Sequence, residues 1–206
     1  MPPTDLRAAI SSAPMSAVLL ALNLTVFIAV SIEGRLLNVL ALPPDWAGVV
    51  EQPWTLLTVF FTAEALFHIA VAILVIGLFG PRFERVAGSV PVLAVYLLAG
   101  LAGSLAIIAT ATLTGHDETS VGASAAFLGL VGALAASPRA AWGGKLAVGK
   151  IVIVVLVIQL VAPAVGIGDW VSSAAHVVGL AVGAASGYVL RGKTTSERAG
   201  GSIPAR

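Results

Sequence analysis

Three polar side chains, His68, Ser124 and His176, lie within or at the edge of strongly apolar stretches of the sequence. Polar and ionisable groups are costly inside a membrane, so each one calls for a functional or structural reason. A serine hydroxyl is a weak nucleophile until a base removes its proton, and an imidazole can do so near neutral pH. Ser124 and His176 therefore predict a Ser–His dyad, provided that the fold brings them together.

Such a dyad also needs hydrogen-bond donors for the oxyanion that forms during the reaction. Ser124 stands at the start of an apolar stretch, and the first N–H groups of a helix have no partner within it. His68 is a candidate side-chain donor. The stretches that hold Ser124 and His176 contain no Asp or Glu, so we expect no third, orienting carboxylate.

Each of these residues also has a purely structural interpretation. Ser124 lies among glycine and alanine, and such small residues are common where membrane helices pack closely. His68, near the end of its stretch, could face lipid headgroups. His176 lies further inside its stretch and is the hardest of the three to explain without a function.

Composition indicates which elements must position these side chains. Of the 206 residues, 58% are hydrophobic and only 10% are charged, and the mean hydropathy is +1.02. Soluble domains have about 25% charged residues, and disordered chains combine low hydrophobicity with high charge, so both classes are excluded. A net charge of +1 gives no basic surface for nucleic acid, and the absence of cysteine excludes disulfides. We expect no cofactor and no metal.

Hydropathy marks six continuous apolar stretches, which predict an all-α integral membrane protein with a six-transmembrane-helix bundle. The second and fourth are short for the ~20 residues that span a bilayer. We expect a cytoplasmic N-terminus at 1–16, a six-span membrane domain at 17–190 and a disordered cytoplasmic tail at 191–206. The stretches are Ala17–Ile32, Leu66–Gly80, Val90–Leu113, Val121–Ala136, Ala147–Val165 and Val171–Leu190.

The first stretch has an alternative interpretation as a cleaved signal peptide. Arg7 precedes it, and residues 29–31 fit a cleavage site between small residues. Asn23 interrupts the apolar run and Asp5 weakens the basic segment before it, so we favour a retained span.

The distribution of basic residues predicts an orientation. If all six stretches span the membrane, ten of the eleven Lys and Arg fall on the side that holds both termini, and only Arg35 falls on the other. The positive-inside rule places the first side in the cytoplasm. Frequent Ala, Gly and Val suggest a GC-rich bacterial source, so we expect a bacterial cell membrane with both termini cytoplasmic.

In this topology the three polar side chains enter the membrane from the outer side. At 1.5 Å per residue, Ser124 lies ~5 Å below the start of the fourth span and His176 ~8 Å below the start of the sixth. His68 lies in the first turn of the second span, so all three share one depth and can meet. A row of glycines from Gly179 to Gly187 then follows His176 on one helix face, which allows close approach to a neighbouring helix.

Several segments resemble motifs of the rhomboid family of intramembrane serine proteases, in the family's order and over most of the chain. The resemblance implies that Ser124 is the nucleophile, that His176 is the general base, and that His68 and Gly122 belong to the oxyanion and substrate region. It also implies a water-filled cavity that opens to the outside. The matching segments are Gly122-Ala123-Ser124-Ala125 (G-x-S-x), Ala175-His176-Val177-Val178-Gly179 with Gly183 (A-H-x-x-G-x-x-x-G), Trp54-Thr55-Leu56-Leu57-Thr58 (W-R-L-x-T) and Glu84-Arg85 with Gly88 (E-R-x-x-G).

The sequence departs from the family pattern at several positions. The asparagine of the family's H-x-x-x-N motif is Ala72 here, so one side-chain donor to the oxyanion is missing. The other departures are Thr55 for arginine, Ala125 for glycine and Leu128 for an aromatic residue. Because both dyad residues are present, we predict a serine endopeptidase, of reduced activity, that cleaves single-span membrane proteins near the outer surface.

Three other functions remain open from the sequence. A non-catalytic rhomboid-like pseudoprotease would bind transmembrane segments without cleaving them. Glu64, His68 and His176 could form a metal site, although there is no H-E-x-x-H motif. A small transporter would favour internal repeats, and none is visible. The predicted partners are a transmembrane protein substrate and the lipid bilayer, while the sequence does not indicate an oligomeric state.

Overall fold

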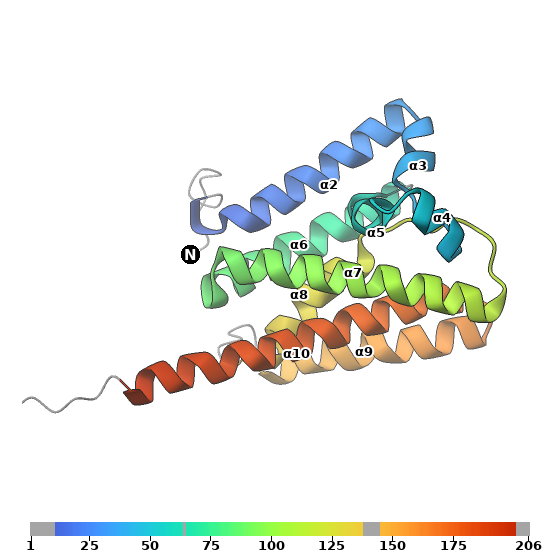
Figure 1. Cartoon of the computed structure of the whole chain (residues 1–206). Coiled ribbons are helices and arrows are strands. Elements are labelled where there is room, and N and C mark those ends of the chain that lie inside the picture. Colours follow the sequence, from blue (N-terminus) through green and yellow to red (C-terminus); the bar gives the residue numbers. More distant parts are fainter. Residues whose placement is uncertain (1–10, 64, 138–144, 201–206) are drawn as a thin grey trace, which may run out of the picture.

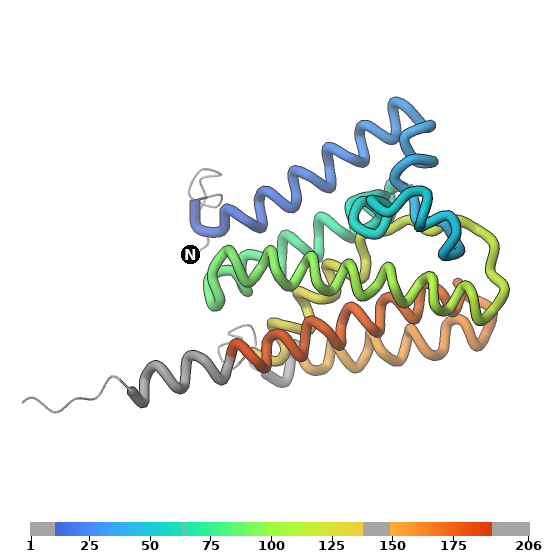
Figure 2. The backbone as a smooth tube through the Cα atoms, in the orientation of Figure 1, coloured from blue at the N-terminus to red at the C-terminus, as the bar shows by residue number. Residues whose placement is uncertain are grey.

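The computed structural model describes residues 11–63, 65–137 and 145–200 of the chain. Every regular element in these ranges is a helix, apart from an isolated β-bridge between Leu42 and Ser120. Figure 1 shows the long helices running alongside one another, and Figure 2 traces the same backbone path. Residues 1–10 and 201–206, which belong to the two predicted terminal segments, lie outside the described ranges.

Four helices of the described ranges are long and apolar enough to cross a membrane: α2 (Pro14–Ile32), α6 (Leu66–Ala87), α7 (Ser89–Thr114) and the Trp170–Leu190 part of α10 (Trp170–Gly200). Two apolar helices are shorter: α8 (Ser124–Ala136) and the Gly149–Ala164 part of α9 (Lys145–Ala164). Each of these helices overlaps one predicted stretch. The prediction of an all-α membrane protein with six apolar helices is confirmed.

Two helix ends differ from the predicted boundaries. α6 does not stop at Gly80 but continues through Pro81 to Ala87, so the second span has 22 residues and is not short. Phe83 beyond the proline is only 1% exposed, and its packing outweighs the one helical hydrogen bond that a proline removes. α10 continues past Leu190, where we expected a tail to begin, as far as Gly200.

The short helix α8 forms the centre of the bundle. Its 13 residues extend for only ~20 Å, whereas the hydrocarbon core of a bilayer is ~30 Å thick. All residues from Ala125 to Leu134 are buried, and α6, α7, α9 and α10 all contact this helix. At least one end of α8 must therefore lie below a membrane surface.

The connection between α2 and α6 folds into short helices at one end of the bundle (Figure 1). Its two tryptophans, Trp46 and Trp54, are about half exposed, as expected for side chains at the depth of lipid headgroups. The helices are α3 (Arg35–Leu40), α4 (Trp46–Glu51), α5 (Thr55–Thr58) and the 3-10 helix η1 (Val59–Phe61).

Buried polar contacts hold α2 against the rest of the bundle. The Glu84 carboxylate of α6 accepts hydrogen bonds of 2.8 Å from the N–H groups of Met15 and Ser16, and one of 2.6 Å from the Ser16 hydroxyl. Asn23 donates its side-chain N–H to the Tyr96 hydroxyl oxygen at 2.9 Å. Asn23, which interrupts the first apolar stretch, thus has a partner on α7, and α2 is an integral part of the fold.

Candidate active site

The predicted nucleophile and base meet at one end of the central helix. Ser124 is the first residue of α8, and His176 lies in the second turn of α10. Although 52 positions separate them in the sequence, Ser124 Oγ and His176 Nε2 are only 2.6 Å apart. With Nε2 unprotonated, the serine hydroxyl donates to the imidazole, which is the arrangement that a general base needs.

A row of glycines on α10 makes this short distance possible. Two helix backbones can approach this closely only where no side chain separates them. The predicted close approach of the sixth span is therefore confirmed, and its neighbour is α8. A Cβ atom at Gly179, Gly183 or Gly187 would lie 2.3, 1.9 or 2.3 Å from the carbonyl oxygen of Ala125, Gly129 or Ala133, respectively.

His176 has no carboxylate partner among the described residues. Its Nδ1 atom is buried and makes no hydrogen bond. The carboxylate of Asp169 instead accepts hydrogen bonds from the Ser172 N–H at 2.7 Å and from the Ser172 hydroxyl at 2.8 Å, at the start of α10. In this part of the chain the site is thus a serine–histidine pair and not a triad.

A cavity of about 310 Å³ adjoins this pair. His68, Gly122, Ser124 and His176 all line it, so the structure brings the four predicted site residues to one place. His68 lies on an exposed part of α6, whereas Ala72, one turn further on, is 1% exposed and does not line the cavity. Of these two positions, only His68 directs a polar side chain to the site.

The turn before Ser124 determines which backbone donors are available. Gly122 has a φ of +141°, in a region that L side chains rarely adopt, and its N–H points to the Val59 carbonyl oxygen at 3.4 Å. Gly122 thus shapes the turn, and its own N–H is already engaged. The first N–H groups of α8 have no acceptor within their helix. They and the His68 imidazole are the donors that an oxyanion at Ser124 can use.

Of the three residues considered for a metal site, Glu64 lies outside the described residues. The described residues of the chain contain no group of three His, Asp or Glu side chains that could hold a metal ion. His176 Nε2 lies 2.6 Å from Ser124 Oγ, so this nitrogen is engaged by the serine.

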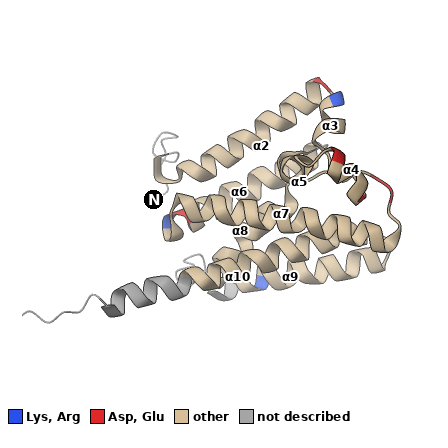
Figure 3. Cartoon of the chain, in the orientation of Figure 1, with Lys and Arg blue, Asp and Glu red and all other residues tan. Residues whose placement is uncertain are grey.

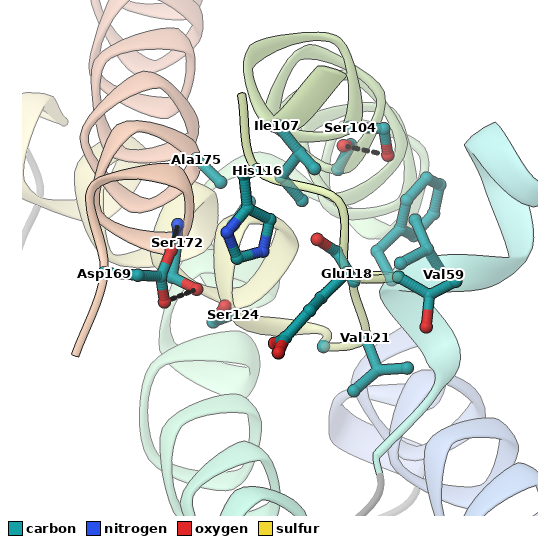
Figure 4. A pocket seen from close by; sticks show the side chains of 17 residues that line it. Val59, Ser104, Ile107, His116, Glu118, Val121, Ser124, Asp169, Ser172 and Ala175 are labelled. Carbon is teal, nitrogen blue, oxygen red and sulfur yellow. Dashed lines mark hydrogen bonds between the residues drawn. The ribbon is translucent and has the colours of Figure 1, made fainter. Parts of the chain in front are cut away.

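A second cavity, of about 170 Å³, lies beside Ser124 (Figure 4). Its lining includes Ser124 and Gly122 but neither His68 nor His176. The titratable side chains of this lining are His116, Glu118 and Asp169. Sequence reasoning did not identify this cavity. The sequence feature that could have indicated it is the polar segment 116–120, which directly precedes the apolar stretch that holds Ser124.

Comparison with known proteins gives consistent matches over this region. A family model described as the Rhomboid domain matches residues 50–193. RHOMBOID-like protein 6, mitochondrial, of Arabidopsis thaliana is 30% identical over 151 residues, which cover 71% of this chain and 47% of that protein. RHOMBOID-like protein 7 of the same plant is 31% identical over 147 residues, covering 70% of this chain and 46% of that protein. The chain thus spans less than half the length of these curated relatives.

Proposed function

The chain belongs to the rhomboid family, and on that premise we propose that it is an intramembrane serine endopeptidase. It cleaves single-span membrane proteins near the outer surface by a Ser–His dyad. The observation that carries this proposal is the distance of 2.6 Å between Ser124 Oγ and His176 Nε2. A serine that served only helix packing would not need a histidine at this distance, and an ionisable residue within a span is costly without a function.

The chemistry begins when Ser124 Oγ attacks the carbonyl carbon of the scissile peptide bond and its proton passes to His176 Nε2. The carbonyl oxygen becomes an oxyanion, which the first N–H groups of α8 and the His68 imidazole stabilise. The imidazolium then gives its proton to the amide nitrogen, the C–N bond breaks and the amine product leaves. Water, deprotonated by His176, hydrolyses the acyl-serine ester and restores the hydroxyl.

The length of α8 supports cleavage within the membrane but close to its surface. A helix of ~20 Å in a ~30 Å hydrocarbon core leaves room above its first residue, Ser124. The cavity beside the dyad carries the polar side chains of Gln159, Asp169 and Ser172. A cavity of about 310 Å³ with these polar groups in its lining can hold several hydrogen-bonded water molecules, which the hydrolysis step requires.

We place both termini on the cytoplasmic side of a bacterial cell membrane. Figure 3 shows acidic residues at the end of the bundle that holds α3, α4 and the α7–α8 connection. Basic residues near the end of α6 and the start of α9 lie toward the opposite end (Figure 3). This distribution agrees with the positive-inside rule if the active-site end faces outward.

The test is activity of the purified full chain in detergent micelles. We expect Ser124→Ala to abolish both cleavage of a single-span reporter protein and labelling by a fluorophosphonate, which needs an activated serine. His176→Ala should reduce both nearly as far, because an unassisted hydroxyl attacks slowly. Ser186→Ala is the matched control, since its hydroxyl bonds only to the Val182 carbonyl on the same helix. Cleavage that persists in folded Ser124→Ala protein would refute the proposal.

The replacement of the family's asparagine by Ala72 favours a second candidate, a pseudoprotease that binds transmembrane segments. Loss of one oxyanion donor typically lowers kcat by about 10²–10³-fold. A wild-type protein that captures the reporter but neither cleaves it nor reacts with the fluorophosphonate would establish this alternative. Cleavage at any rate that depends on Ser124 would exclude it.

A further inference from the structure

We propose that Tyr96 is a positioning residue for the nucleophile Ser124, and that it acts through the hydrogen bond from its hydroxyl to the Phe60 carbonyl oxygen. The inference rests on the proposed function and adds to it a residue of α7 that lines neither of the two cavities beside Ser124. It depends on the partners of the Tyr96 hydroxyl and on the contacts that lead from Phe60 to Ser124.

The Tyr96 hydroxyl joins three segments of the bundle. Its side chain is 0% exposed, and a buried hydroxyl within a membrane helix needs protein partners because lipid offers none. The hydroxyl accepts the side-chain N–H of Asn23 at 2.9 Å and lies 2.9 Å from the Phe60 carbonyl oxygen. Its single proton goes to Phe60, since the side-chain oxygen of Asn23 is further away at 3.3 Å. Tyr96 thus links α7 to both α2 and η1.

The Phe60 carbonyl group depends on this donor. Phe60 belongs to η1, and the last carbonyl groups of a helix have no N–H partner within it. Because Phe60 is only 1% exposed, water does not replace a lost donor there. α7 also fixes the ring: its centroid is 6.0 Å from that of Tyr96, edge-on, and a Cβ atom at Gly100 would lie 2.6 Å from the Phe60 Cγ atom. Residues of α7 therefore set the place of Phe60.

The position of η1 matters for the turn that precedes the nucleophile. Val59 and Phe60 form part of the wall of the 170 Å³ cavity, which Gly122 and Ser124 also line (Figure 4). The Gly122 N–H points to the Val59 carbonyl oxygen at 3.4 Å. Only one residue separates Gly122 from Ser124, the first residue of α8. A shift of η1 would therefore move the wall against which this turn rests, and with it the serine.

A purely structural role for Tyr96 would be to pair the Asn23 amide within the membrane. That role predicts a loss of stability alone, whereas positioning predicts slower chemistry as well. Two substitutions separate the roles. Tyr96→Phe and Asn23→Leu both remove the bond between Asn23 and Tyr96, but only Tyr96→Phe removes the bond to Phe60.

The experiment measures the rate of fluorophosphonate labelling at Ser124, together with thermal unfolding, for the purified full-length variants in detergent micelles. A hydrogen bond within a protein typically changes an equilibrium by about two- to tenfold. We therefore expect Tyr96→Phe to slow labelling, and to lower kcat for a single-span reporter, by about two- to tenfold. Asn23→Leu is the matched control. It should lose stability and keep the wild-type labelling rate, because the Tyr96 hydroxyl still donates to Phe60.

Gly100→Ala provides a second test that leaves both hydrogen bonds of Tyr96 in place. Its Cβ atom would lie 2.6, 2.7 and 2.9 Å from three ring atoms of Phe60, so the ring has to move. We expect labelling to slow in this variant also. Gly77→Ala is its control, because the nearest atom to its Cβ is 4.0 Å away, and it should label at the wild-type rate. If Tyr96→Phe protein does not fold, the Gly100→Ala result decides the inference.

The outcomes that contradict this inference differ from those that contradict the proposed function. Folded Tyr96→Phe or Gly100→Ala protein that labels at the wild-type rate would overturn the positioning role and leave the protease intact. Equal slowing in Asn23→Leu and Tyr96→Phe would also overturn it, because the effect would then come from the contact with α2. Absence of labelling and of cleavage in the wild-type protein would overturn both proposals.

Discussion

Gly179→Ala should separate the dyad without touching either of its residues. Gly179 lies three positions after His176 on α10, and it faces Ala125, the residue that follows Ser124 on α8. A new Cβ atom would lie 2.3 Å from the Ala125 carbonyl oxygen and 2.8 Å from the carbonyl carbon, both backbone atoms that cannot turn aside. The substitution therefore acts on the distance between the two helices.

The size of the effect can be worked out from these distances. Ordinary contact begins at about 3.4 Å, so the helices must separate by about 1 Å at this point. A separation of this size would lengthen the Ser124–His176 contact from 2.6 Å to about 3.6 Å, beyond a normal hydrogen bond. Misplacement by ~1 Å costs about 10²-fold in rate, and overpacking costs about 1–3 kcal/mol of stability.

The assay measures the rate of fluorophosphonate labelling at Ser124 together with thermal unfolding. Gly187→Ala is the first control, because its Cβ would meet the Ala133 carbonyl oxygen at the same 2.3 Å but two turns further from the dyad. It should lower stability by a similar amount and slow labelling much less. Gly77→Ala on α6 is the second control, since the nearest atom to its Cβ, on Leu20, is 4.0 Å away.

Two results would refute this reasoning. Gly179→Ala protein that labels at the wild-type rate would show that the helix distance does not control the dyad. Equal loss of labelling in folded Gly187→Ala protein would show that the effect comes from general destabilisation.

Three further predictions concern single groups. In thermal unfolding, Glu84→Gln should lower the unfolding free energy by about 1–3 kcal/mol, because it weakens four hydrogen bonds, three to the start of α2 and one to Ser89. The control Glu51→Gln, at an exposed position, should change this free energy by less than about 0.5 kcal/mol. Gly122→Ala should cost about 1–3 kcal/mol and slow labelling, because a φ of +141° strains any L-residue. Gly34→Ala, at a φ of −56° with open space, should do neither. Labelling should also fall reversibly when the pH is lowered enough to protonate His176, since imidazolium cannot accept the serine proton; a pH-independent rate would contradict its role as base.

The six helices could be predicted from the sequence because the membrane penalises polar groups within each segment separately. A continuous apolar run has to form a helix in lipid whatever its neighbours are, since its backbone groups must be paired internally. The same penalty singled out Ser124 and His176 as the polar residues that need a reason. The end of α6 was misplaced at Gly80 because the apolar run ends before Arg82, Glu84 and Arg85, whereas the helix continues to Ala87 and buries Phe83.

The identity of the neighbouring helices was decided only by the tertiary structure. A helix that is apolar all round has no polar face to show which side turns inward, so hydropathy could not assign α8 as the neighbour of the glycine row on α10. Nor could it show that Ala72 is buried outside the cavity that His68 reaches. The 170 Å³ cavity beside Ser124 is lined in part by the segment before α8, which backbone bonds between Leu42 and Ser120 join to a distant part of the sequence. Contacts of this kind leave no periodic pattern in either segment, and so this cavity became visible only in the folded chain.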